Sequence, residues 1–221
     1  MRTIGLLGGS FDPPHNAHLA MADAFAVALC LDEIRFVPAS QPWQKRGLFA
    51  SCEEREAMLA AALAHHRAPH GRYLIDAREL RRAGKTYTIA TLEELRREVG
   101  ADVSLVFLFG ADQLVHLDTW KDWRRLWDYA HLAAATRPAF DIRTMPPEVA
   151  YEWSSRLGDA EALRAQPSGR SYLLDDFAHD VSATDIRAAL VAGDAAAISE
   201  TSRLVPSAVL DYIRANHLYR S

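Results

Sequence analysis

Residues 3–18 read TIGLLGGSFDPPHNAH, and this stretch decides the fold. The short apolar run 3–8, stopped by glycine, is typical of a strand buried on both faces of a parallel sheet. The glycine pair 8–9 permits a tight turn and lets a ligand approach the main chain closely. The two prolines that follow fix a rigid exit, so we expect the next helix to begin near His15 or Asn16.

The predicted helix start is suited to binding an anion. Its first amide groups have no partner within the helix, and they lie at the positive end of the helix dipole. His15 and His18 are three residues apart, a spacing at which both imidazoles point the same way. An isolated pair of this kind more often reflects surface or core polarity, or half of a metal site, although no Cys or acidic partner lies at zinc-ligand spacing. After a strand and a glycine turn, the pair predicts stabilisation of phosphate charge.

Residues 9–18, GSFDPPHNAH, resemble the G-x-F-D-P-x-H-x-G-H signature of the nucleotidyltransferase superfamily of adenylyl- and cytidylyltransferases. Ala17 stands where that family usually has glycine. The chain has neither G-x-G-x-x-G nor G-x-x-x-x-G-K-[ST], so dinucleotide-fingerprint and P-loop chemistry are not indicated. The resemblance implies that His15 and His18 hold phosphate oxygens during catalysis. It also implies that the turn binds ATP through Gly8, Gly9, Ser10 and Phe11.

Composition limits the classes of protein that need to be considered. A chain of 221 residues fits one α/β domain with a full core. Its 25 basic and 29 acidic residues argue against a general nucleic-acid binder. Two cysteines fit a reducing compartment better than a disulfide scaffold. No signal-like segment and no apolar run of about 18 residues is found, so we expect a cytoplasmic protein with no membrane partner.

Strand and helix patterns alternate along the whole chain. Strands are expected over 3–8, 33–38, 73–76, 102–109, 130–136 and 172–174, and helices from about 16 and over 52–66, 89–98, 113–117, 148–157 and 206–214, with another entered near 182. Strand, helix and strand at these connection lengths form right-handed parallel units. The pattern predicts a Rossmann-like α/β fold, doubly wound, with a mainly parallel sheet and helices on both faces. We expect one nucleotidyltransferase domain over residues 1–221.

A loop over 39–51 follows the second predicted strand, at the edge where open α/β sheets bind ligands. Its two adjacent cations, Lys45 and Arg46, could reach a phosphate or could simply be solvated, as is more usual for Arg46. The family resembled here often carries P-P-H-K in this loop, where this chain has PWQK. Because the lysine is kept and Gln44 replaces the histidine, the resemblance implies a catalytic role for Lys45 alone.

Residues 85–92, KTYTIATL, are similar to the S-Y-T-x-x-T-L segment of nicotinate-mononucleotide adenylyltransferases. In that family the segment lies by the pyridine ring. Thr88 is also a plausible N-cap of the helix that follows. The resemblance implies that Tyr87 and Thr88 bind nicotinate mononucleotide.

Gly110 and Asp112 follow the most strand-like run of the chain. A carboxylate at this edge of a sheet could accept hydrogen bonds from ribose hydroxyls, or could cap a short helix. With Trp120 the two residues match the family's G-x-D…L-x-x-W pattern, which implies ATP contacts for Gly110 and Asp112 and ring stacking by the indole. The resemblance also places Arg137 near the nucleotide, although an arginine at a strand end is commonly solvated.

Residues 181–187, VSATDIR, resemble the superfamily's second signature, I-S-[ST/A]-T-x-I-R. Ser182 fits an N-cap on its own account. Arg187 lies about a turn inside the helix, where its planar guanidinium can bind phosphate oxygens. The resemblance implies that Arg187 draws the leaving pyrophosphate and that Ser182 and Thr184 contact ATP.

Four matches in the family's order identify the chain as a member of the bacterial nicotinate-nucleotide adenylyltransferase family. The resemblance implies adenylyl transfer from ATP to nicotinate mononucleotide, giving deamido-NAD and pyrophosphate, with Mg²⁺ bound mainly through the ATP phosphates and no metal site of the protein's own. The alternatives are nicotinamide mononucleotide or a phosphopantetheine-like acceptor, or a nucleotide-binding module without catalysis. The sequence leaves open the choice between acid and amide, monomer or homo-oligomer, and the role of residues 139–170.

Overall fold

The computed structural model describes residues 1–40, 48–136, 141–175, 177, 181–192 and 201–220. The roles expected for Lys45 and Arg137 therefore lie outside the described residues. None of the described helices is both long enough and apolar enough to cross a membrane.

Strands and helices alternate, as the sequence pattern predicts. In chain order they are β1 (Arg2–Gly9), α1 (Asn16–Leu29), β2 (Glu33–Pro38), α2 (Cys52–Ala64), β3 (Arg72–Ile75), α3 (Thr88–Val99), β4 (Val103–Gly110), the 3₁₀ helices η1 (Ala111–Thr119) and η2 (Trp123–Arg125), α4 (Leu126–Tyr129), β5 (His131–Ala135), the 3₁₀ helix η3 (Ile142–Thr144), α5 (Pro147–Ser154), α6 (Ala160–Arg164), β6 (Ser171–Leu174), α7 (Ala183–Ala192) and α9 (Ser207–Ala215).

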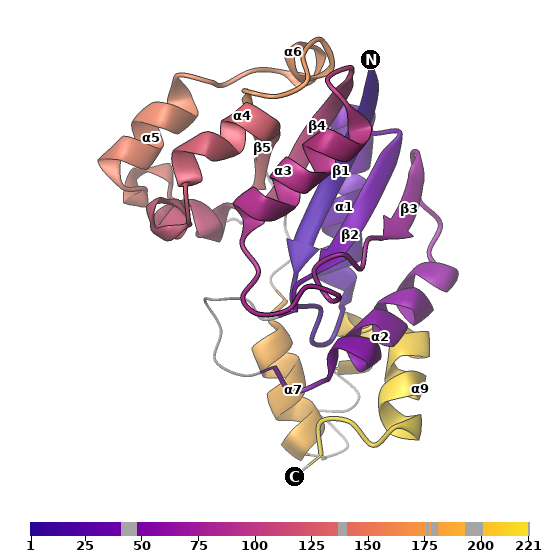
Figure 1. Ribbon diagram of the computed structural model, residues 1–221. Helices are drawn as coiled ribbons and strands as arrows, with labels where there is room; N and C mark the ends of the chain where they lie inside the picture. Colours follow the sequence, from indigo (N-terminus) through magenta and orange to yellow (C-terminus); the bar gives the residue numbers. More distant parts are fainter. Residues whose placement is uncertain (41–47, 137–140, 176, 178–180, 193–200, 221) are drawn as a thin grey trace.

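The strands form one six-stranded sheet in the order β3-β2-β1-β4-β5-β6, and every neighbouring pair is parallel (Figure 1). This is the order of a doubly wound, Rossmann-like fold, so the predicted fold class is confirmed. The chain moves outward from β1 in one direction and from β4 in the other. A crevice at the carboxyl ends of β1 and β4 is the expected ligand site of such a sheet.

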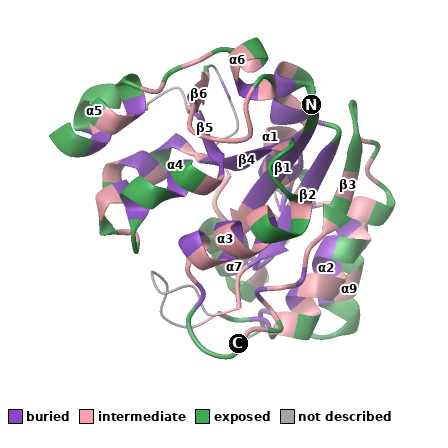
Figure 2. Cartoon of the chain, turned by 45° about the horizontal axis from the view of Figure 1, so that its top comes forward, coloured by how far each residue is buried: buried purple, intermediate pink, exposed green. Residues whose placement is uncertain are grey.

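The sheet is buried on both faces because its central strands are largely apolar, and the buried hydroxyls of Thr3 in β1 and Ser104 in β4 are hydrogen-bonded. Leu105 and Phe107 of β4 join a cluster with α3, η1, α4 and α5, whereas Val106 and Leu108 join a second cluster with α1. Figure 2 shows the central strands buried between helices whose outer sides are exposed. The region 139–170 contributes to both clusters, since Trp153 of α5 packs in the first and Leu163 of α6 in the second.

A third group of helices lies beyond the carboxyl ends of the strands. In Figure 1, α2, α7 and α9 gather below the arrowheads of β1 and β2. Their contact is a separate apolar cluster that includes Met58 of α2, Ile186 of α7, Ile213 of α9 and Tyr219 near the C-terminus. The sequence signature that contains Ile186 is thereby brought back to the edge of the sheet where β1 ends.

Two predicted helix caps are wrong. Tyr87, in extended conformation, is the N-cap of α3, so Thr88 is the first helical residue and caps nothing. The Tyr87 ring packs against the core, which fixes where the chain turns into the helix. After β4 the chain forms a 3₁₀ helix with Gly110 as its N-cap, so Asp112 lies inside the first turn.

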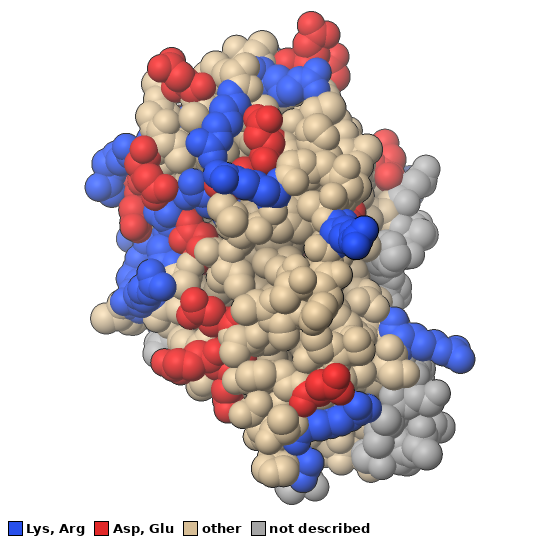
Figure 3. Space-filling view, turned by 90° about the vertical axis from the view of Figure 1, so that its right-hand side faces the viewer, with Lys and Arg blue, Asp and Glu red and all other residues tan. Residues whose placement is uncertain are grey.

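The amino end of β2 carries a buried charge network. Glu33 is 1% exposed and accepts hydrogen bonds from Arg2, Arg35 and Arg72. Burial alone would raise the pKa of Glu33, but the hydrogen bonds from Arg35 and Arg72 outweigh it and hold the pKa below its usual value. On the face that carries β3 and α2, basic and acidic side chains are interleaved in the upper half (Figure 3). The described charges at this amino end of the sheet, opposite the end where β1 leads into α1, are thus largely paired.

His131 at the start of β5 is fully buried and uses both ring nitrogens. Its Nδ1 accepts from the backbone N–H of Arg170 at 3.0 Å, and its Nε2 lies 3.0 Å from the carbonyl of Gln166. The ring is therefore neutral, with its proton on Nε2. Burial lowers the pKa of His131 from 6.5 to about 4.

We expect acid to destabilise the protein through His131. Between pH 6.5 and about 4 the His131 imidazole is protonated in the unfolded chain but stays neutral in the folded protein. The free energy of unfolding should therefore fall by about 2 kcal/mol from pH 7 to pH 5, as measured by urea denaturation. His131→Gln should flatten this dependence, whereas His65→Gln, at an exposed position, should not. Equal slopes for all three proteins would contradict the assignment.

Candidate active site

The loop from Ser10 to His15, here called the phosphate loop, joins β1 to α1. Phe11 has a φ of 49°, in the left-handed region that non-glycine residues rarely adopt, and its ring is buried. A Cβ on Gly9 would lie 3.0 Å from that ring, and one on Gly8 would lie 3.3 Å from Phe107. Both glycines lie in β1, and a side chain at either position would press its Cβ against an aromatic ring.

The two histidines of the phosphate loop and α1 lie face to face. Their ring centroids are 3.6 Å apart, and Phe11 meets His18 edge-on at 4.9 Å. The backbone N–H of His15 donates to Nδ1 of His18 at 3.2 Å, so a neutral His18 carries its proton on Nε2. His15 is 6% exposed. The structure therefore holds both imidazoles together at the N-terminus of α1.

Asp12 is the buried centre of the phosphate loop, with 1% of its surface exposed. Its carboxylate accepts from the backbone N–H groups of Phe49 (2.8 Å) and Ala50 (3.2 Å) and from the Tyr219 hydroxyl (2.6 Å). Burial, and then the hydrogen bond to Asp12, raise the pKa of Tyr219, so the phenol remains a donor. One carboxylate thereby connects the start of the chain, the entry to α2 and the C-terminal segment.

Arg187 of α7 reaches the phosphate loop. Its Nη1 donates to the carbonyl of Asp12 at 2.6 Å, and its Nη2 lies 3.3 Å from the Thr184 hydroxyl. The guanidinium also lies over the Phe49 ring, 4.7 Å from its centroid. Ser182 accepts from the N–H of Thr184, which agrees with its expected capping position. The two signature segments, 175 residues apart, thus form one site.

An aromatic patch lies beside the phosphate loop. The Phe107 ring lies beside Gly8, 3.3 Å from where a Cβ on that glycine would stand, and its centroid lies 6.0 Å from that of the Trp120 indole. Tyr87 packs against the same core, and the ammonium of Lys121 lies 5.0 Å from the centre of its ring. The structure thus brings Tyr87 and Trp120 to the same core, and the Phe107 ring connects Trp120 to the end of β1.

Gly110 and Asp112 lie at the carboxyl end of β4, next to β1. Gly110 is close to α1, since an added Cβ would come within 3.9 Å of Met21. The same Cβ would lie 2.5 Å from the Asp112 carboxylate, so a side chain at this position would displace that carboxylate. The Asp112 side chain is exposed and accepts a hydrogen bond from Gln113 at 2.7 Å. Both residues lie at the carboxyl edge of the sheet, where β4 pairs with β1.

Comparison with known proteins agrees with this arrangement. The model of the cytidylyltransferase-like family matches residues 6–189. A "Probable nicotinate-nucleotide adenylyltransferase" of Herminiimonas arsenicoxydans is 49% identical, with 100% of this chain and 98% of that protein covered. A protein of the same description from Chromobacterium violaceum is 44% identical, with 98% of each covered. The chain belongs to the nicotinate-nucleotide adenylyltransferase family.

Solved structures share the fold of this family member. The nicotinic acid mononucleotide adenylyltransferase of Plasmodium falciparum complexed with NaAD superimposes with a TM-score of 0.76 at 18% identity, over 99% of this chain and 98% of that one. A putative nicotinate-nucleotide adenylyltransferase from Vibrio parahaemolyticus gives a TM-score of 0.58 at 14% identity, over 99% and 96%. At such identities the likeness concerns the fold alone.

Arg55 was missed by the sequence analysis, although it supports the phosphate loop of this nucleotidyltransferase. The side chain is 0% exposed and donates to the carbonyls of Ser10 (2.8 Å) and Ser40 (3.4 Å). The signal was present in its spacing, because Arg55 shares the inward face of α2 with Met58 and Leu59. A charged residue on an apolar face indicates a buried polar partner.

We expect Tyr219→Phe to lower the free energy of unfolding by about 2 kcal/mol, because the buried Asp12 carboxylate loses a hydroxyl donor. Chemical denaturation at pH 7 measures the change. The matched control is Tyr212→Phe on α9, whose hydroxyl bonds to none of the described residues and which should change stability by less than about 0.5 kcal/mol. Equal effects of the two substitutions would argue against the connecting role of Asp12.

Proposed function

We propose that this protein transfers the adenylyl group of ATP to nicotinate mononucleotide, giving deamido-NAD and pyrophosphate in NAD biosynthesis. The observation that carries the proposal is the hydrogen bond from Arg187 to the Asp12 carbonyl, which joins the second signature to the loop that presents His15 and His18. The full-length similarity to relatives described as nicotinate-nucleotide adenylyltransferases supports the acceptor.

The reaction needs alignment and charge neutralisation more than covalent help from the protein. A 5′-phosphate oxygen of the acceptor forms a bond to the α-phosphorus of ATP, while the bond to the bridging oxygen breaks and pyrophosphate leaves with the electron pair. In this proposal His15 and His18, which stack at the N-terminus of α1, hold α- and β-phosphate oxygens. Arg187 would draw the pyrophosphate, and the same role for Lys45 stays a prediction.

ATP would bind across the carboxyl ends of β1 and β4. The proposed contacts come from the glycine turn and phosphate loop, from the end of β4 and from the start of α7; they are Gly8, Gly9, Ser10, Phe11, Gly110, Asp112, Ser182 and Thr184. The order of the strands supports this position, since the chain reverses direction between β1 and β4.

Mg²⁺ would be held mainly through the phosphates of ATP. The described side chains proposed to hold the phosphates, His15, His18 and Arg187, are imidazole and guanidinium groups, whereas Mg²⁺ prefers oxygen ligands. No group of three or more metal-ligating side chains occurs in the described part of the chain. When bound, the ion would neutralise charge on the phosphates.

The acceptor would lie on the aromatic patch, with Trp120 stacked on the pyridine ring and Tyr87 and Thr88 beside it. The Lys121 ammonium places a positive charge next to Tyr87. This charge favours a carboxylate on the ring over a neutral amide.

Small nucleotides are the proposed partners, and the cytoplasm is the proposed compartment. The near balance of 25 basic and 29 acidic residues supports a protein that binds phosphate locally and not nucleic acid in general.

We expect His18→Ala to lower kcat by about 10²–10³, because a preorganised donor to the phosphate charge is lost. Pyrophosphate release from ATP and nicotinate mononucleotide measures the rate. His65→Ala, at an exposed position after α2, should leave the rate unchanged. A wild-type rate in His18→Ala would refute the assignment.

We expect kcat/KM for nicotinate mononucleotide to exceed that for nicotinamide mononucleotide by at least about tenfold, which corresponds to about 1.4 kcal/mol. The two acceptors are compared side by side by pyrophosphate release. A preference for the amide, or for phosphopantetheine, would replace the proposed acceptor. ATP binding without turnover of any acceptor would indicate a nucleotide-binding module.

A further inference from the structure

Glu79 is a buried carboxylate that takes no part in the reaction described above. It is 8% exposed and lies in the turn between β3 and α3. The Thr91 hydroxyl donates to its Oε1 at 2.6 Å, and the Thr86 side chain lies near the same carboxylate. Burial raises the pKa of Glu79, against the lowering effect of these two neighbouring threonines. A carboxylate is costly to bury, so its partners define what it does.

The two partners of Glu79 lie on either side of the acceptor segment. Thr86 directly precedes Tyr87, and Thr91 lies in the first turn of α3, which begins at Thr88. Both threonines are buried, with 5% and 4% of their surfaces exposed. The Glu79 carboxylate thus lies near the residue that precedes Tyr87 and accepts a hydrogen bond from the first turn of α3, which follows it.

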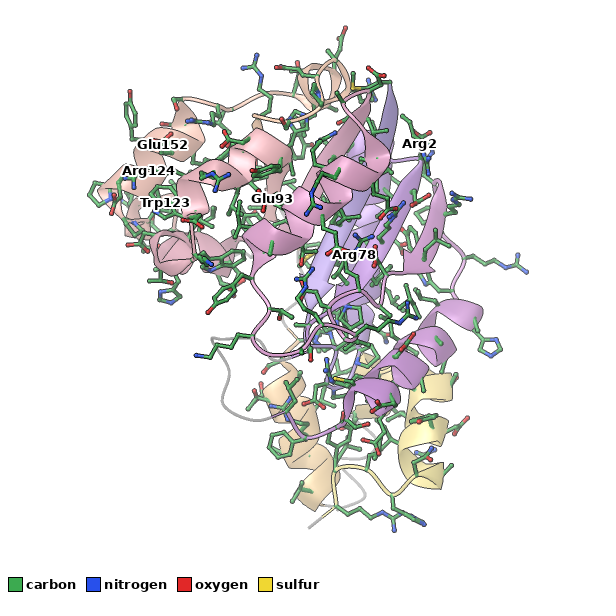
Figure 4. The ribbon with its side chains drawn as sticks, in the orientation of Figure 1. Arg2, Arg78, Glu93, Trp123, Arg124 and Glu152 are labelled. Carbon is green, nitrogen blue, oxygen red and sulfur yellow. The ribbon has the colours of Figure 1, made fainter. Side chains whose placement is uncertain are left out.

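Two arginines hold the Glu79 turn against α3. Arg82 donates to the Thr91 hydroxyl oxygen at 3.0 Å and to Glu94 at 2.6 Å. The Thr91 hydroxyl therefore accepts a hydrogen bond from Arg82 and donates one to Glu79. Arg78, which lies where α3 faces the strands in Figure 4, pairs with Asp76 and with α3 through Glu98. The Glu79 turn is therefore bonded to α3 in its first turn at Thr91, in its middle at Glu94 and in its last turn at Glu98.

We propose that Glu79 is a positioning residue for the nicotinate mononucleotide site, acting through Thr86 and Thr91 on the segment that carries Tyr87 and Thr88. This inference rests on the proposed function. ATP is bound in that proposal by the phosphate loop, the end of β4 and α7, and no described hydrogen bond joins Glu79 to those elements. Loss of the Glu79 carboxylate should therefore raise the KM for nicotinate mononucleotide and leave the KM for ATP nearly unchanged.

The test compares KM for each substrate in Glu79→Gln, Thr91→Val and Thr91→Ser. We expect KM for nicotinate mononucleotide to rise about tenfold in Glu79→Gln and in Thr91→Val, with KM for ATP changed less than about twofold. Thr91→Ser keeps the hydroxyl and should restore the wild-type value. Glu33→Gln is the matched control, because Glu33 is equally buried but lies at the amino end of β2. It should lower thermal stability without altering either KM.

Each outcome separates a positioning role from a merely structural one. An unchanged acceptor KM in both Glu79→Gln and Thr91→Val would overturn the inference, as would a parallel rise of both KM values or the same rise in Glu33→Gln. If Glu79→Gln fails to fold, the comparison of the acceptor KM between Thr91→Val and Thr91→Ser tests the inference by itself. A wild-type protein that forms no dinucleotide from nicotinate mononucleotide would instead overturn the proposed function, and this inference with it.

Discussion

The buried carboxylate of Asp12 is the interaction on which the site depends. A carboxylate removed from water must be satisfied by donors, and Asp12 takes them from the entry to α2 and from Tyr219 near the C-terminus. Its own carbonyl accepts from Arg187. Segments at the beginning, in the first quarter and at the end of the chain are thus brought to one point, just before the two histidines.

The topology of the sheet determines where the loop that carries Asp12 lies. Because the chain winds outward from β1 and then from β4 in the opposite direction, the carboxyl ends of these two strands lie side by side at the edge where such sheets bind ligands. Glycines end both strands: a Cβ on Gly9 would press against the Phe11 ring, and one on Gly110 would displace the exposed Asp112 carboxylate. The third apolar cluster, formed by α2, α7 and α9, then closes the lower side of the site and carries Arg187 to it.

Some parts of the site were readable from local pattern and others were not. Apolar runs predicted the positions of the strands, two of which, β1 and β4, end at glycine. The prolines before Asn16 predicted that α1 begins there. The expected caps at Thr88 and Asp112 failed, because the packing of the Tyr87 ring and the 3₁₀ turn after Gly110 decided those helix starts. Arg55 was missed because its partners are backbone carbonyls, which no sequence pattern names.

The sequence by itself determined the order of strands and helices and the family, since both depend on residues near one another in the chain. Only the tertiary structure decided that Arg187 reaches Asp12, that Tyr219 bonds to the same residue and that Glu79 holds the start of α3. The physical reason is that buried polar groups must find partners. Which partner comes within reach is set by how the helices pack beyond the sheet, and not by spacing along the chain.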